Sequence, residues 1–188
     1  MCIVATVRSL LVLTVLVPVL SVATTSNDPQ QQPFGAYDPV FTPFYSNGSL
    51  NVEVIPAYAN FTTSMGTDTI ILGGSTGEWP SLTSEERILC LKAWRAALDE
   101  LKQTTKSVPK LLFHAGDTAL VRAVELARQA QQYGADEILI VAPCIMKPAT
   151  LDVLIEVIGL VAAAAPNLPA WLVSCQACFF VASPPINE

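Results

Sequence analysis

Strand-like and helix-like patterns alternate along most of the chain. From Gly35 onward, short apolar runs of strand length are each followed by a longer segment with apolar residues at helical spacing. Continuous apolar runs suit parallel strands that are buried on both faces. The predicted strands are a short one leading into 40–42, then 69–72, 110–114, 137–142 and 169–173, and the predicted helices are 52–65, 83–104, 117–134 and 150–165. The pattern therefore predicts about five strands and four helices in an α/β domain.

Local signals mark the ends of these predicted helices. Gly66 follows the first helix as a stop, and the run Thr83-Ser84-Glu85-Glu86 has the form of a capping box. Asp117 or Thr118 is predicted to be the N-cap of the third helix. Each predicted helix is thus bounded by residues that can satisfy its end groups.

Two architectures fit this alternation: an open doubly wound sheet and a TIM barrel. The loop after the first strand lacks the G-x-G-x-x-G pattern, which argues against a dinucleotide-binding fold. A full barrel needs eight strand–helix units and about 250 residues. This chain has 188 residues, so as a barrel it holds about the first four to five units.

The N-terminal segment differs from the rest. Arg8 precedes a short apolar run that ends in small residues at Ser21-Val22-Ala23, which is typical of a secretory signal peptide over 1–23. An uncleaved membrane anchor and a wrongly assigned start of the reading frame are the alternatives. This run also explains a hydrophobic share of 52% and a mean hydropathy of +0.47. The polar segment 24–35 is predicted to be a linker, and the domain then spans 36–173.

Charge and cysteines exclude several classes of function. The formal net charge is −6, so the sequence favours neither nucleic acid nor an anionic membrane as a partner. Cys175-x-x-Cys178 has the spacing of a zinc or redox pair, but no second pair follows and His114 lies far upstream. We therefore predict no metal and no cofactor. Cys90 and Cys144 lie in apolar patterns and are predicted to be buried thiols.

The most informative segment is Gly73-Gly74-Ser75-Thr76-Gly77-Glu78. It follows a predicted buried strand and precedes a capped helix, which in a barrel is the active-site face. Its glycines allow the backbone to approach a ligand closely, and two adjacent hydroxyls with backbone amides can bind a carboxylate. A plain glycine turn before the next helix is the alternative interpretation.

Several motifs together resemble the dihydrodipicolinate synthase and N-acetylneuraminate lyase superfamily. Thr42-Pro43-Phe44 resembles the end of its first strand, and Gly74–Glu78 is similar to its G-[ST]-T-G-E motif. Phe113–Gly116 is similar to the H-x-G of the lyase branch, where the synthase branch has a Gly-Thr turn. The further motifs are the S-E-E-R of 84–87, G-A-D at 134–136, A-P at 142–143, K-P-A at 147–149 and A-A-A-A-P-N-L-P at 162–169. The resemblance covers about 37–169 and implies an incomplete TIM (β/α)8 barrel.

The resemblance also implies a chemistry. Members of the superfamily are class I aldolases, in which a lysine amine forms a Schiff base with the substrate ketone and a tyrosine shuttles a proton. By position, Ser75 and Thr76 are the expected ligands of the pyruvate carboxylate. Thr42, Gly74 and Gly77 are expected to line the same pocket. The implied partners are pyruvate or a sialic acid-type small molecule, and the implied assembly is a homo-oligomer, a tetramer in the family.

The pattern departs from the superfamily at its C-terminal end. Val173 stands where the proton-shuttling tyrosine is expected, and 174–188 resembles nothing in the family. No Schiff-base lysine follows, and Lys147, in a proline-flanked loop, is a poor substitute. We therefore expect no catalytic residue in this chain and no activity of the chain alone. Open alternatives are a synthase-like enzyme and a non-catalytic isoform that associates with a full-length subunit.

The N-terminal segment and the family resemblance predict different cellular locations. The N-terminal segment predicts a secreted protein that has no membrane segment after signal cleavage. The resemblance implies a cytoplasmic enzyme instead.

Overall fold

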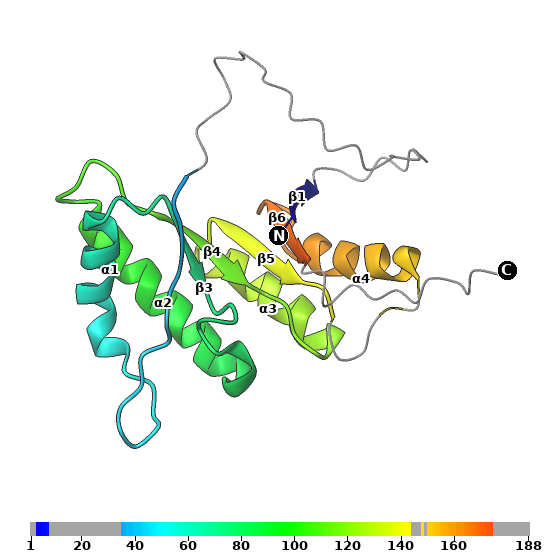
Figure 1. Cartoon of the computed structure of the whole chain (residues 1–188), viewed down its shortest axis with the longest axis horizontal. Helices are drawn as coiled ribbons and strands as arrows, with labels where there is room; N and C mark the ends of the chain where they lie inside the picture. The colour runs from blue at the N-terminus through cyan, green and yellow to red at the C-terminus, as the bar shows by residue number, and fades with distance from the viewer. Residues whose placement is uncertain (1–2, 8–34, 144–147, 149, 175–188) are drawn as a thin grey trace, which may run out of the picture.

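The computed structural model describes residues 3–7, 35–143, 148 and 150–174. They form one six-stranded sheet with α-helices packed against it (Figure 1). The strands are β1 (Ile3–Val7), β2 (Tyr37–Pro39), β3 (Thr69–Leu72), β4 (Lys110–His114), β5 (Glu137–Val141) and β6 (Ala170–Ser174). The helices are α1 (Ile55–Ser64), α2 (Ser84–Leu101), α3 (Leu120–Gln132) and α4 (Leu151–Ala163), with short 3-10 turns η1 (Val52–Val54) and η2 (Trp79–Ser81).

The strand order decides between the two predicted architectures. Strands β2 to β6 are parallel and lie side by side in the order of the sequence. A doubly wound sheet reverses direction at a switch point, whereas this sheet does not. Right-handed crossovers in one direction place every helix on the same face, and α1 to α4 pack one against the next. The predicted incomplete (β/α)8 barrel is therefore confirmed.

Strand β1 was not predicted. It lies within the segment predicted to be a signal peptide, and it pairs antiparallel with β6, with Ile3 opposite Ser174 and Val7 opposite Ala170. The pairing covers the edge of β6 that would otherwise present unpaired backbone groups. The signal peptide and the linker over 24–35 stay predictions.

Helix starts follow the predicted signals with one exception. The capping box of α2 is confirmed: the Glu86 N–H donates to Thr83 Oγ1 at 3.2 Å and the Thr83 N–H donates to Glu86 Oε2 at 2.8 Å. The prediction that Asp117 or Thr118 is the N-cap of α3 was wrong, since the N-cap is Ala119. The reason is that Asp117 Oδ1 accepts the Ala119 N–H at 3.0 Å, which closes a turn before the helix begins.

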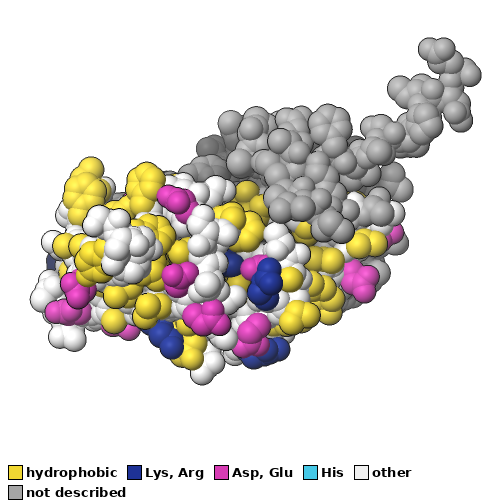
Figure 2. Space-filling model, turned by 90° about the horizontal axis from the view of Figure 1, so that it is seen from below, with side chains coloured by type: hydrophobic (Ala, Val, Ile, Leu, Met, Phe, Trp, Pro, Cys, Tyr) yellow, Lys and Arg dark blue, Asp and Glu magenta, His cyan; other side chains and the backbone are white. Residues whose placement is uncertain are grey.

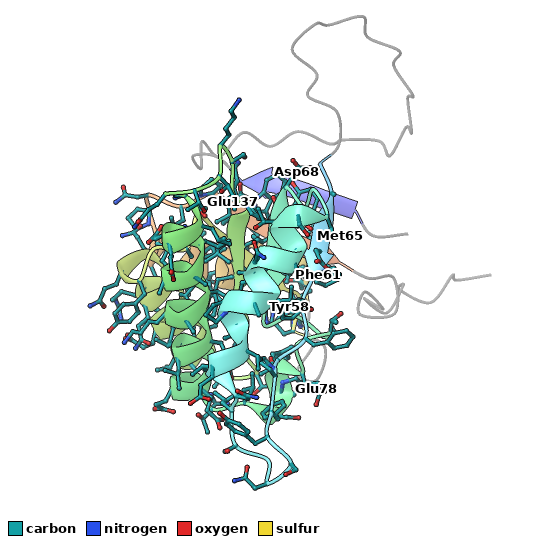
Figure 3. The ribbon with its side chains drawn as sticks, turned by 90° about the vertical axis from the view of Figure 1, so that its left-hand side faces the viewer. Tyr58, Phe61, Met65, Asp68, Glu78 and Glu137 are labelled. Carbon is teal, nitrogen blue, oxygen red and sulfur yellow. The ribbon has the colours of Figure 1, made fainter. Side chains whose placement is uncertain are left out.

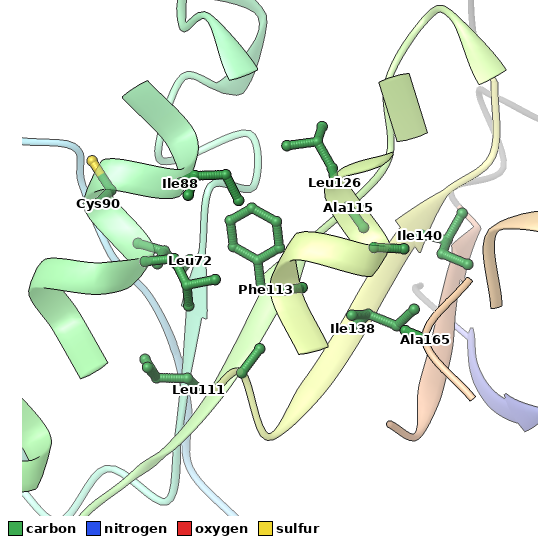
Figure 4. Packing of buried hydrophobic residues seen from close by; sticks show 14 of the residues in the cluster. Leu72, Ile88, Cys90, Leu111, Phe113, Ala115, Leu126, Ile138, Ile140 and Ala165 are labelled. Atoms are coloured by element: carbon green, nitrogen blue, oxygen red, sulfur yellow. The ribbon is translucent and has the colours of Figure 1, made fainter. Parts of the chain in front are cut away.

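The core lies between the sheet and the helices (Figure 4). Leu111, Phe113 and Ile138 are fully buried there, and α2 contributes Cys90. The prediction that Cys90 is a buried thiol is confirmed, and burial raises its pKa to about 11. Cys144, Lys147, Cys175 and Cys178 lie outside the described residues. Among the helices that the structure describes, none combines the length and the apolar character that crossing a membrane requires.

Candidate functional site

The candidate site lies at the edge of the sheet where the parallel strands end. β2, β3 and β4 end at Pro39, Leu72 and His114, so the segments that follow them meet at one edge. Figure 3 shows Glu78, at the end of the loop after β3, at one end of the molecule, with Asp68 and Glu137 at the other. The structure therefore brings the predicted loop 73–78 and Thr42 to the expected face.

The backbone of this loop requires its glycines. Gly73 has φ +71°, a left-handed conformation that side chains rarely adopt. A Cβ on Gly77 would lie 3.2 Å from the backbone N and Cα of Gly73 and 3.2 Å from the Val40 carbonyl oxygen. Glu78 ends the loop in the left-handed region at φ 54°. The loop is thus folded tightly back on itself and onto the end of β2.

Thr42 fastens this loop to the first βα segment. Its hydroxyl donates to the Gly77 carbonyl oxygen at 2.7 Å, and the side chain is half-buried. The bond joins residues that are 35 positions apart in the sequence. Thr42 therefore contacts the backbone of Gly77, and its place in a ligand pocket stays a prediction.

Ser75 and Thr76 form the turn of the loop. Ser75 is exposed and Thr76 is half-buried, so both are within reach of a ligand at this edge. Their positions are fixed by backbone bonds: the Glu78 N–H donates to the Ser75 carbonyl at 3.1 Å, and the Trp79 N–H donates to the Gly74 carbonyl at 3.4 Å. The arrangement can present two hydroxyls and a glycine-lined backbone to a small anion.

Beneath the loop, His114 ends β4 as a fully buried side chain. Burial first and the nearby Arg87 charge second lower its pKa to about 3, so the ring is neutral at physiological pH. Its ring lies 5.2 Å from that of Trp79, centroid to centroid. His114 is thus a buried residue at the end of a strand.

Arg87 and Asp117 complete this buried cluster. Arg87 Nη1 lies 3.6 Å from Asp117 Oδ2, and the Arg87 side chain is 1% exposed. Burial tends to raise the pKa of Asp117, but hydrogen bonds from the Arg122 side chain and the Ala119 N–H outweigh it, and the net pKa is lowered. The sequence did not reveal this cluster, because Arg87 and His114 are 27 positions apart and Arg87 looked like an ordinary residue in the first turn of a helix.

Within the ranges that the structure describes, His, Cys, Asp and Glu side chains form no group of three that could hold a metal ion.

Comparison with known proteins gives one family. Residues 32–174 match the model of the Dihydrodipicolinate synthetase family. The chain is 36% identical over 145 residues to human N-acetylneuraminate lyase, covering 75% of this chain and 42% of that protein. It is 33% identical over 132 residues to the N-acetylneuraminate lyase of Danio rerio.

Solved structures agree with the sequence matches. Proteus mirabilis N-acetylneuraminate lyase superposes with a TM-score of 0.66 at 28% identity, over 74% of this chain and 45% of that one. Dihydrodipicolinate synthase from Cyanidioschyzon merolae, solved with lysine bound, superposes with a TM-score of 0.65 at 27% identity, over 73% and 44%. The chain therefore spans less than half the length of the relatives that it matches.

Proposed function

Because this chain belongs to the dihydrodipicolinate synthetase family, we propose that it carries the pyruvate-carboxylate half of an N-acetylneuraminate lyase-type aldolase site. The intact reaction cleaves N-acetylneuraminate to N-acetylmannosamine and pyruvate. The observation that carries the proposal is the glycine-lined loop 73–78, which holds Ser75 and Thr76 at the C-terminal edge of the sheet. In a barrel, this edge is where substrates bind.

The geometry suits a small carboxylate. A carboxylate needs several donors that converge from one side, and hydroxyls with backbone N–H groups supply them without a bulky side chain. The Thr42 bond to Gly77 fixes the loop before a ligand arrives, which reduces the entropy lost on binding. Ser75 and Thr76 are the proposed carboxylate ligands, and Gly74 and Gly77 shape the pocket.

A lyase-type substrate is favoured over the synthase alternative by His114. Its ring ends β4 directly below the loop, and Gly116 leaves room for it, since a Cβ there would lie 2.7 Å from His114 Nε2. The packing of the His114 ring thus requires the glycine of the H-x-G motif of the lyase branch. A synthase-like enzyme is the alternative within the same family.

We propose that the chain alone does not complete the reaction. The family's lysine condenses with the substrate ketone to give an imine and one water molecule. The lysines of the described residues lie away from the C-terminal edge of the strands. Lys110 begins β4 and donates to Glu137 at 3.1 Å, and Lys92 lies over the Tyr133 ring. Lys102 and Lys106 follow α2. Val173, the fourth of the five residues of β6, has an aliphatic side chain that cannot shuttle a proton.

Two measurements test these statements separately. Calorimetric titration of the 188-residue chain with pyruvate should show binding that Thr76→Val weakens by roughly tenfold or more, because a hydrogen bond to a charged group is lost. Ser81→Ala, an exposed position in η2, is the matched control and should leave the affinity unchanged. Equal affinity in the Thr76 variant would remove this loop as the site.

Borohydride trapping tests the catalytic half. Borohydride reduces an imine to a stable secondary amine, so a lysine that reacts with pyruvate gains a mass that peptide mapping can locate. We expect no adduct on the chain alone. A pyruvate adduct on any lysine would show that the chain forms its own Schiff base.

The second candidate function is a non-catalytic chain that associates with a full-length lyase-type subunit. The supporting observation is the surface of α4, where Leu151, Ile155 and Leu160 are each about half exposed. Figure 2 shows hydrophobic side chains spread between acidic and basic ones on one face. Co-expression with a full-length lyase and co-purification would support it, and recovery of the two chains in separate fractions would argue against it.

We further propose secretion, on the basis of the N-terminal segment alone. Expression with a C-terminal tag should give a tagged product in the medium that has lost about the first 23 residues. An intact tagged product confined to the cytoplasm would support the cytoplasmic alternative.

A further inference from the structure

Arg87 is a buried cation that contacts Trp79, which follows the candidate loop, and His114, which ends β4. It is 2% exposed, and a charge this deep is costly unless it is paired. Burial lowers the pKa of Arg87 to about 10, although the Asp117 carboxylate raises it, so the guanidinium stays charged at physiological pH. Its Cζ atom lies 5.6 Å from the centroid of the Trp79 ring and 5.7 Å from that of Phe113. Trp79 is the residue that directly follows the loop.

The second contact of Arg87 is with His114. Arg87 Nη2 donates to the His114 carbonyl oxygen and lies 3.3 Å from His114 Nδ1. A guanidinium has donors only, so Nδ1 must be the acceptor and must lack a proton. A neutral ring with a bare Nδ1 carries its proton on Nε2. The arrangement therefore sets the tautomer of His114.

The proton-bearing Nε2 is buried beside Gly116. It lies 2.7 Å from the position that a Cβ on Gly116 would occupy. The Gly73 backbone raises the pKa of His114 as a nearby acceptor, but Nε2 has no partner with full hydrogen-bond geometry among the described residues. The charged groups that act on the ring are Arg87 from α2 and Asp117 from the segment after β4. The Arg87 contact therefore fixes which ring nitrogen carries this buried, unpartnered proton.

We propose that Arg87 is a positioning residue for the Gly73–Gly77 loop. It acts through Trp79, on which it packs, and through the His114 ring, whose tautomer it sets and which also lies against Trp79. The Trp79 N–H donates to the Gly74 carbonyl oxygen at 3.4 Å, so the packing of Arg87 on Trp79 bears directly on the loop. The effect of Arg87 on ligand binding rests on the proposed function, because that effect requires pyruvate to bind to this loop. The local statement about His114 does not depend on that assumption.

The chain contains one histidine, which makes the test direct. With ¹⁵N-histidine in the full chain, a long-range ¹H–¹⁵N spectrum identifies the protonated ring nitrogen between about pH 5 and pH 8. We expect the Nε2–H tautomer throughout, with no titration. A ring protonated on Nδ1, or one that titrates near its ordinary pKa, would overturn the proposal without any variant.

Variants test the role of Arg87 itself. Arg87→Met should give a mixture of tautomers, shift the Gly73–Gly77 amide signals and weaken pyruvate binding roughly fivefold to tenfold. Arg87→Lys keeps the charge but loses the planar guanidinium with its paired donors, so it should show the same changes to a smaller degree. It replaces Arg87→Met in the test if that variant does not fold. Arg122→Met is the matched control, because Arg122 also pairs with Asp117, at 2.8 Å, but is 56% exposed.

The outcomes separate the two proposals. If the original chain binds no pyruvate, the proposed function fails, and the positioning role is then judged by the ring tautomer and the loop amide signals alone. If Arg87→Lys changes the ring tautomer and the loop amide signals no more than Arg122→Met does, the positioning role is wrong. Equal pyruvate affinity in the Arg87 variants and the control would overturn its consequence for binding.

Discussion

At the scale of single residues, close packing around His114 makes the sharpest prediction. A Cβ on Gly116 would lie 2.7 Å from His114 Nε2 and 3.3 Å from the Val141 backbone nitrogen, and neither can move easily in a buried site. Gly116→Ala should therefore lower the free energy of unfolding by about 1–3 kcal/mol. Urea denaturation measures it.

Gly159 provides the matched control for this substitution. A Cβ on Gly159 meets nothing within 4 Å, and the residue lies inside α4. Gly159→Ala should be neutral or stabilising by up to about 1 kcal/mol, since alanine is the better helix former. Equal destabilisation by both substitutions would show that the fit around His114 is not tight.

His114 also predicts a dependence of stability on pH. Its pKa is lowered from 6.5 to about 3 by burial first and by the Arg87 charge second. Between these values the unfolded chain binds a proton that the folded chain does not, so the free energy of unfolding falls as the pH falls, by up to about 1.4 kcal/mol per pH unit. The His114→Gln variant has no titrating group at this position, so its free energy of unfolding should depend less steeply on pH. Identical slopes in the two proteins between about pH 6 and pH 4 would contradict this account.

At the scale of secondary-structure elements, the capping box places α2 and hence Arg87. Thr83→Ala removes the acceptor of the Glu86 N–H and should cost about 1 kcal/mol of unfolding free energy. Thr83→Ser keeps a hydroxyl and should cost much less. Thermal unfolding of the three proteins side by side distinguishes them, and equal loss in both variants would show that the cap is not the cause.

Strand β1 predicts an effect of removing the N-terminal segment. Without residues 1–23, the edge of β6 loses its antiparallel partner and presents unpaired backbone groups. The shortened chain should aggregate more readily and exchange its β6 amide protons faster than the full chain. If both chains are equally soluble and equally protected in β6, the pairing of β1 does not stabilise this edge in solution.

The sequence predicted the elements well where a local signal exists. Apolar runs identified β3, β4 and β5, and Thr83, Thr150 and Gly66 marked helix ends, because these signals act over a few residues. The pairing of β1 could not be predicted, since it joins segments that are far apart in the chain. Asp117 was misassigned because its carboxylate bonds the Ala119 N–H of a turn that precedes α3.

For the molecule as a whole, the same contrast holds at the candidate site. The loop 73–78 and Thr42 could be predicted because motif and position coincide at one sheet edge. The ion pair of Arg87 with Asp117, and the contact of Arg87 with His114, could not, because they depend on how α2 crosses the end of β4. Half of a barrel thus holds the glycine-lined loop that we propose binds an anion, together with the buried ion pair of Arg87 and Asp117.

The central claim is that this loop binds the carboxylate of pyruvate, and amide mapping tests it most directly. A ¹⁵N-labelled chain is titrated with pyruvate, and the shifts of all amide signals are followed. The account predicts saturable shifts that are largest from Gly73 to Gly77, with smaller ones at Thr42. Saturable shifts located elsewhere, or no shifts in this loop at any pyruvate concentration, would contradict it.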